Sequence, residues 1–140
     1  MIMPWHIYQE AEADGISVHF LHMEAQPSLS VPGHMAIDIE KLPTTAEEST
    51  AAVHEIGHIN TGSFYNIYSP FNNRRKCENR ADRNAIQRYI NKDELLCLLK
   101  RGITQPWELA EYFGFTEDFI KKAICLYIHG NLAVEYYMQI

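Results

Sequence analysis

The stretch that decides the fold is Thr44–Gly62, TTAEESTAAVHEIGHINTG. It opens with a capping box, in which the Thr44 hydroxyl can meet the amide of Glu47 while the Glu47 side chain reaches back. It closes on a glycine, the residue that most readily ends a helix. The stretch therefore predicts a helix that begins after Thr44 and runs to about Thr61.

Inside this helix, His54, Glu55 and His58 form an HExxH pattern. Two histidines four residues apart lie on one face of a helix, so both imidazoles can reach a single metal ion at about 2.0–2.1 Å. Glu55 lies roughly 100° around the helix from His54, which suits a general base acting on metal-bound water better than a third ligand. The alternative interpretation is a surface helix with two solvated histidines.

A third ligand is needed, because a catalytic zinc site has three protein ligands and one open position. Glu78 and Asp82 follow on a second predicted helix, about Arg75–Ile90, and their spacing of four places them on one face. Glu78 can then bind the metal while Asp82 accepts a hydrogen bond from a ligand histidine. The alternative is a charged helix face in which both acids pair with the nearby cations Arg74, Arg75 or Lys76.

The remaining elements are short strands and further helices. A short helix is predicted from Pro4, ended by Gly15. Strand-like spacing predicts a small antiparallel sheet before the HExxH helix, formed by residues 16–22, 28–31 and 34–40. Capping residues and glycine stops predict three more helices after Asn91, ending at Gly102, Gly114 and Gly130.

Together these elements predict an α+β fold in a single domain over residues 1–140, which is long enough for one hydrophobic core. The domain is mostly helical. Residues 1–90 hold the sheet and the two metal-site helices, and residues 91–140 form a C-terminal helical part.

Composition limits the class of protein. With 46% hydrophobic and 21% charged residues the chain is of ordinary globular type, and a net charge of −6 argues against a nucleic-acid ligand. No run approaches the roughly 18 apolar residues of a membrane span, and the first residues lack the pattern of a secretory signal. The three cysteines show no CxxC spacing, as in a reducing compartment. We therefore expect a cytoplasmic protein without membrane or direct nucleic-acid contact.

HEIGH followed by CENRADRNA resembles the ImmA/IrrE family of zinc peptidases, whose members share HE-x-G-H and a downstream E-x-x-A-(D/N)-x-x-A element. The segments TGSFYNIYS and WELAEYFGFTEDFIKKA are also similar to family segments, so the resemblance spans most of the chain beyond residue 40. Asn84 departs from it, since many relatives have an aromatic residue there. The resemblance implies a zincin-like, gluzincin-type domain with His54, His58 and Glu78 as Zn²⁺ ligands.

The same resemblance implies limited proteolysis of a specific protein, typically a helix-turn-helix transcriptional repressor of a phage or mobile element. Glu55 would take a proton from the zinc-activated water and pass it to the leaving amine. Tyr65 and Tyr68, in the aromatic loop after the motif, are candidates to stabilise the oxyanion, with simple ring packing as the alternative. The strand at 34–40 is expected to offer a free edge to an extended substrate, with Asp38 as a charge that prevents such pairing as the alternative.

A second function is compatible with the sequence. In it, the chain is a non-catalytic regulatory or protein-binding module with a structural or absent metal, and the C-terminal helices contact a partner. Glu55 discriminates between the two, because a purely structural metal site has no use for a base beside its ligands.

Overall fold

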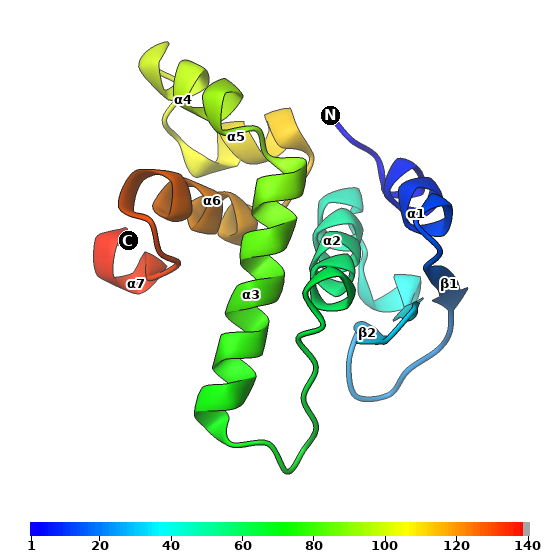
Figure 1. Ribbon diagram of the computed structural model, residues 1–140. Helices are drawn as coiled ribbons and strands as arrows, with labels where there is room; N and C mark the ends of the chain where they lie inside the picture. Colours follow the sequence, from blue (N-terminus) through cyan, green and yellow to red (C-terminus); the bar gives the residue numbers. More distant parts are fainter. Residues whose placement is uncertain (139–140) are drawn as a thin grey trace.

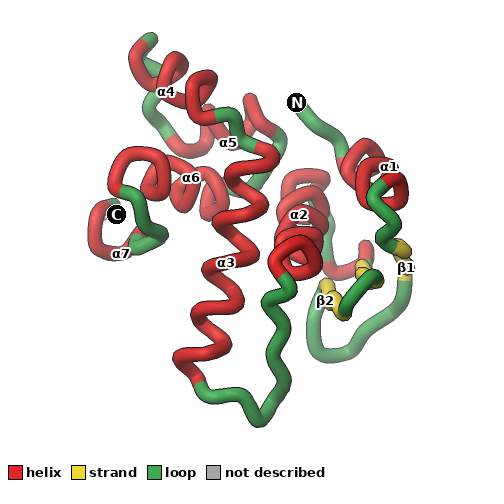
Figure 2. Tube along the Cα trace, viewed as in Figure 1, coloured by secondary structure: helices red, strands yellow, loops and turns green. Residues whose placement is uncertain are grey.

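A computed structural model describes residues 1–138 and has the predicted α+β fold, in which helices dominate (Figures 1 and 2). Along the chain the elements are α1 (Pro4–Ala13), β1 (Ser17–Phe20), β2 (Ser28–Val31), β3 (His34–Ile37), the short 3-10 helix η1 (Ile39–Lys41), α2 (Thr45–Thr61), α3 (Phe71–Tyr89), α4 (Lys92–Lys100), α5 (Pro106–Phe113), α6 (Glu117–His129) and α7 (Val134–Tyr137).

Helix α2 has the ends that its sequence predicts. The Thr44 hydroxyl accepts a hydrogen bond from the amide of Glu47 at 3.1 Å, and Gly62 ends the helix in the left-handed conformation at φ 65°. Both signals act within one turn of chain, so the prediction needed no tertiary information. The HExxH pattern therefore lies in the second half of a regular 17-residue helix.

The sheet differs from the predicted antiparallel one. Its order is β1-β3-β2, with β2 antiparallel and β1 parallel to β3. A tight turn at Gly33, with φ 80°, joins β2 to β3 as a hairpin, whereas residues 21–27 carry the chain from β1 across to the far side of β3. The expectation that β3 offers a free edge is therefore wrong, because β3 is the central strand and β2 is an edge strand.

Helix α2 lies between the sheet and α3, and α6 packs against the other side of α3 (Figure 1). One hydrophobic core runs through these layers, from Ile7 in α1 to Leu126 in α6. Its fully buried side chains include Met35 and Ile37 of β3, Ile56 of α2, Ile86 of α3 and Ile120 of α6. His54 and His58 of α2 thus project from a helix that is packed on two sides.

The C-terminal helices follow their capping signals. Asn91 accepts from the Glu94 amide at 2.9 Å, and Thr116 accepts from the Phe119 amide at 3.3 Å. Helix α3 begins at Phe71, four residues before the predicted start, and α7 was not predicted. No helix within residues 1–138 is both long enough and apolar enough to cross a membrane.

Candidate metal centre

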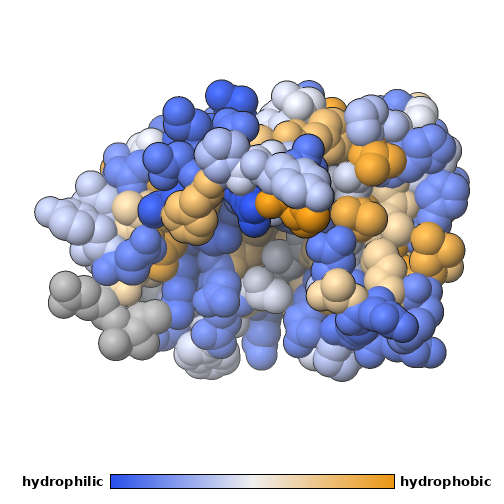
Figure 3. Space-filling view, turned by 90° about the horizontal axis from the view of Figure 1, so that it is seen from below, coloured by the Kyte–Doolittle hydropathy of each residue, from blue (hydrophilic) through white to orange (hydrophobic). Residues whose placement is uncertain are grey.

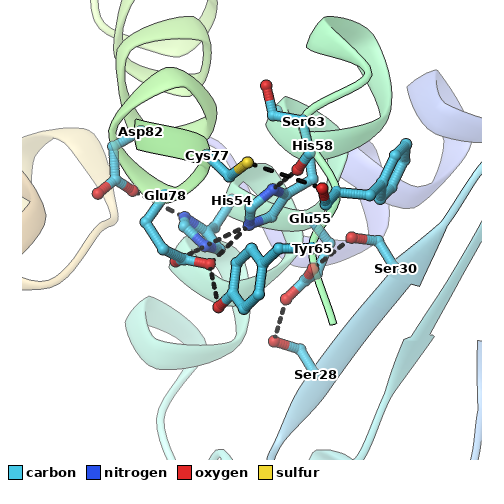
Figure 4. Close-up of polar contacts among 12 residues, drawn as sticks. Ser28, Ser30, His54, Glu55, His58, Ser63, Tyr65, Cys77, Glu78 and Asp82 are labelled. Carbon is cyan, nitrogen blue, oxygen red and sulfur yellow. Dashed lines mark hydrogen bonds and ion pairs between the residues drawn. The ribbon is translucent and has the colours of Figure 1, made fainter. Parts of the chain in front are cut away.

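Helices α2 and α3 bring the three predicted ligands together (Figure 4). His54 and His58 project from α2 toward α3, and Glu78 projects back from α3. Glu78 Oε2 lies 2.8 Å from His54 Nε2, Glu78 Oε1 lies 3.1 Å from His58 Nε2, and the two Nε2 atoms are 3.1 Å apart. Two imidazole nitrogens and a carboxylate, all within 4.8 Å of one another, can hold a metal ion.

The other nitrogen of each ring is already occupied. His54 Nδ1 donates to Asp82 Oδ1 at 2.7 Å, and His58 Nδ1 donates to the backbone carbonyl oxygen of Ser63. Because a carboxylate and a carbonyl only accept hydrogen bonds, both Nδ1 atoms must carry the hydrogen. Once Nε2 of each ring has lost its proton, the rings would present their Nε2 lone pairs to the same point, which is the tautomer that a metal site requires.

Both alternative interpretations of these residues are wrong. The two histidines are not solvated surface residues, since their side chains are 21% and 8% exposed and their ring nitrogens bond to groups of the protein. Glu78 and Asp82 do not pair with the cations beside them in sequence. Arg74 instead donates to the Ser69 carbonyl oxygen at 2.9 Å.

Charge at the centre favours a cation. Burial raises the pKa of Glu78, but hydrogen bonds with His54, His58 and Tyr65 outweigh it and hold that pKa well below its usual value. Burial likewise lowers the pKa of His54, yet its bonds to Asp82 and Glu78 raise the pKa to about 10. Without a metal, the positive charge of the protonated His54 ring offsets the negative charges of Glu78 and Asp82. A bound metal ion would supply positive charge at the same place.

Asp82 belongs to the same network. Burial raises the pKa of its carboxyl, but the hydrogen bond from His54 and the charges of His54 and Lys122 lower it, so that it stays ionised. Its second oxygen, Oδ2, accepts from Lys122 Nζ of α6 at 2.8 Å. Lys122 is a contact that the sequence did not indicate.

Glu55 projects from α2 toward the sheet, on the side of the helix away from α3. It is 6% exposed, and both of its oxygens accept hydrogen bonds from serines of β2. Ser28 Oγ donates to Oε2 at 2.7 Å and Ser30 Oγ donates to Oε1 at 2.6 Å (Figure 4). The Glu55 carboxylate is therefore held beside the three candidate ligands and is not one of them.

Sequence reasoning missed the two serines, although a signal exists. In SLSV the alternate residues share a face, and a strand that packs on a helix normally turns its apolar residues inward. Here the serines face α2, while Leu29 and Val31 are 44% and 49% exposed. A strand whose polar residues face an HExxH helix and whose apolar residues face solvent indicates that the polar side chains interact with that helix.

Of the two tyrosines proposed for the oxyanion, the structure brings only Tyr65 to the centre. Its hydroxyl donates to Glu78 Oε1 at 2.7 Å, and this bond, with partial burial, raises the tyrosine pKa to about 12. Tyr68 is 88% exposed and does not line the cleft.

A cleft of about 470 Å³ opens over the three metal residues and Glu55. Strand β2 forms one wall, and residues 63–67 of the loop between α2 and α3 form the other. Figure 3 shows the face that carries this loop, hollowed near its centre, with apolar patches among hydrophilic residues. The outer edge of β2 pairs with no strand in the described part of the chain.

A second group of possible ligands is formed by His22, Asp38 and Glu40. The Asp38 oxygens accept from the amides of Met23 and Glu40, at 2.9 and 3.2 Å. The Asp38 carboxylate therefore caps η1 and holds the loop that contains Met23.

Comparison with known proteins gives no relative from which a role could be transferred. No family model, no curated protein and no solved structure matches this chain.

Proposed function

We propose that the protein is a zinc-dependent peptidase of the ImmA/IrrE type. The observation that carries this proposal is the convergence of His54, His58 and Glu78 from two helices, with Glu55 held beside them and facing the same cleft. Two histidines and one glutamate are the ligand set of many catalytic zinc sites, which leave a fourth position open. A purely structural zinc site uses four protein ligands and no adjacent base.

Each group has a task in peptide hydrolysis. Zinc bound there would supply a Lewis acid for the scissile carbonyl and make a water molecule more acidic. Glu55 accepts the proton of the attacking water and delivers it to the leaving amine. Ser28 and Ser30 hold both oxygens of Glu55, so that its carboxylate does not rotate away from the cleft.

The substrate is expected to bind as an extended segment along β2. That strand's free edge offers backbone donors and acceptors directly beside Glu55, and strand addition is a common mode of peptide recognition. The family resemblance implies a specific protein substrate, a helix-turn-helix repressor of a phage or mobile element. A substrate segment that pairs with β2 through its backbone must be extended, and so unfolded locally in its own protein.

The test compares wild-type protein with Glu55→Gln and Glu78→Ala. We expect one zinc per chain in the wild type and in Glu55→Gln, and much reduced zinc in Glu78→Ala. Cleavage of reduced casein, followed by mass spectrometry, should occur only in the wild type. A Glu94→Gln variant is the matched control for Glu55→Gln, because Glu94 also accepts a side-chain hydroxyl, that of Tyr112, but belongs to α4 and does not line the cleft.

Two results would overturn the proposal. Equal cleavage by wild type and Glu55→Gln would remove the base from the mechanism. Full zinc in all three proteins with cleavage in none would favour a binding module with a structural metal.

A further inference from the structure

Lys122 connects the C-terminal helices to the metal centre. Its Nζ donates to Asp82 Oδ2 at 2.8 Å, while Asp82 Oδ1 accepts from His54 Nδ1 at 2.7 Å. One carboxylate therefore joins a lysine of α6 to a histidine of α2, across helix α3. Figure 4 shows the contact between Asp82 and His54, in which the Asp82 side chain projects from α3.

The position of Asp82 makes this contact different from a surface ion pair. The Asp82 side chain is only 8% exposed, whereas that of Lys122 is 39% exposed. Exposed pairs contribute little because water replaces either partner easily. A buried carboxylate that loses its partner instead keeps an oxygen without a donor, or turns to find one.

A rotation of the Asp82 carboxylate would also change its hydrogen bond to His54. Asp82 holds the His54 ring by one hydrogen bond only, so the direction of Nε2 depends on the orientation of the carboxylate. Among residues 1–138, Lys122 is the one lysine or arginine that pairs with Asp82. It therefore fixes the second oxygen, and with it the plane of the group that orients the ligand.

We propose that Lys122 is a positioning residue of the metal centre, which acts through Asp82 on His54 and makes metal affinity depend on the docking of α6. The proposal rests on the metal site of the proposed function. It adds a reciprocal consequence, because two events that are coupled in free energy stabilise each other. Metal binding at α2 and α3 should stabilise α6.

The chain offers a matched control in the neighbouring residue. Lys121 has the same charge and lies in the same helix, but no acidic partner of Lys121 is found in the part of the chain that the structure describes. Lys121→Met and Lys122→Met therefore change net charge equally. The Lys122 side chain borders a cavity of about 390 Å³, so a methionine has room there.

The first experiment measures zinc affinity by competition with a chromophoric chelator. Lys122→Met should bind zinc up to roughly tenfold more weakly than wild type, the lower limit of the loss usual when a direct partner of a ligand, here Asp82, is removed. Lys121→Met should match the wild type, and Lys122→Arg should recover most of the loss. Equal affinity in Lys122→Met and wild type overturns the proposal.

A double-variant cycle tests the route. Asp82→Asn should weaken zinc binding by itself, and adding Lys122→Met to it should cause no further loss, because the lysine acts only through the carboxylate. Additive losses would show that Lys122 affects the metal in another way and overturn the proposal.

Hydrogen exchange tests the reciprocal effect and separates it from a general structural role. Zinc should increase amide protection of residues 117–129 in wild type and Lys121→Met, and clearly less in Lys122→Met. A merely structural lysine would lower protection equally with and without zinc, which overturns the proposal. A wild type that binds no zinc would refute the metal site itself, whereas normal wild-type binding with an unaffected Lys122→Met refutes only the coupling.

Discussion

Gly57 of α2 lies against the backbone of Ala81 of α3 without room for a side chain. A Cβ atom on Gly57 would overlap the Ala81 carbonyl oxygen and lie 2.9 Å from its carbonyl carbon. Gly57 is between the two metal histidines, and Ala81 is between Glu78 and Asp82. The two helix backbones are thus in close contact at the level of the candidate metal centre, and this contact limits how far Glu78 and Asp82 stand from their histidines.

Gly57→Ala should separate the two helices. Overpacking of this kind costs about 1–3 kcal/mol, partly offset by the better helix propensity of alanine, which is worth about 1 kcal/mol. Zinc affinity should fall more clearly, by roughly tenfold or more, since the third ligand moves with α3. Chelator competition and thermal unfolding in EDTA measure the two effects.

Gly102→Ala is the control for Gly57→Ala. Gly102 follows α4 at φ 89°, and a Cβ atom there would meet no other atom within 4 Å. The substitution strains the backbone by about 1 kcal/mol but leaves the two metal helices in place. A similar loss of zinc affinity in both variants would contradict the spacing argument.

Replacing Ser28 and Ser30 by alanine should slow hydrolysis without releasing metal. Each hydroxyl donates to the Glu55 carboxylate, and a hydrogen bond to a charged group is worth about 1.5–3 kcal/mol. If each substitution raises the activation free energy by about half of this hydrogen-bond energy, kcat should fall roughly threefold to tenfold for each serine. Zinc affinity should stay that of the wild type, because neither serine touches a ligand.

Leu29→Ala is the matched control for the serine variants, because Leu29 lies between them in β2 and points the other way, 44% exposed. Its kcat should equal that of the wild type. Loss of zinc from Ser28→Ala/Ser30→Ala would show that β2 supports the whole centre and not Glu55 in particular.

What could be predicted depended on local signals. The bounds of α2 follow from Thr44 and Gly62, residues at its own ends, and the facing of His54 and His58 follows from helix geometry alone. Glu78 could be proposed because its residue type and its place on a second helix complete a known ligand set.

What could not be predicted depended on long-range contacts. The direction of β1 relative to β3 is decided by how residues 21–27 cross the sheet, for which no local pattern exists. Lys122 reaches Asp82 over 40 residues of sequence, and Ser28 reaches Glu55 over 27. These partners become visible only when the helices and the sheet are packed.

Tyr65→Phe should impair catalysis and Tyr68→Phe should not. The Tyr65 hydroxyl lies 2.7 Å from Glu78 Oε1 and Tyr65 lines the cleft, whereas Tyr68 is 88% exposed and does not line it. An oxyanion donor contributes about 10²–10³ in kcat, and a loss of this size is expected for Tyr65→Phe at saturating zinc. Measuring at saturation removes any effect of weaker metal binding. Equal kcat in the two variants would leave the oxyanion without a tyrosine donor.

Zinc binding should release protons at neutral pH. In the metal-free chain burial lowers the pKa of His54, but hydrogen bonds to Asp82 and Glu78 raise it to about 10, and the pKa of His58 is also raised. Below pH 10 the His54 ring therefore carries a proton on Nε2, which must leave before that atom can bind a metal. Apparent zinc affinity should rise about tenfold per pH unit and per released proton between pH 7 and 9. Calorimetry in two buffers of different ionisation enthalpy counts these protons. Asp82→Asn, which removes one cause of the raised pKa of His54, should lower the count, and identical heats in both buffers for the wild type would contradict the protonated metal-free centre.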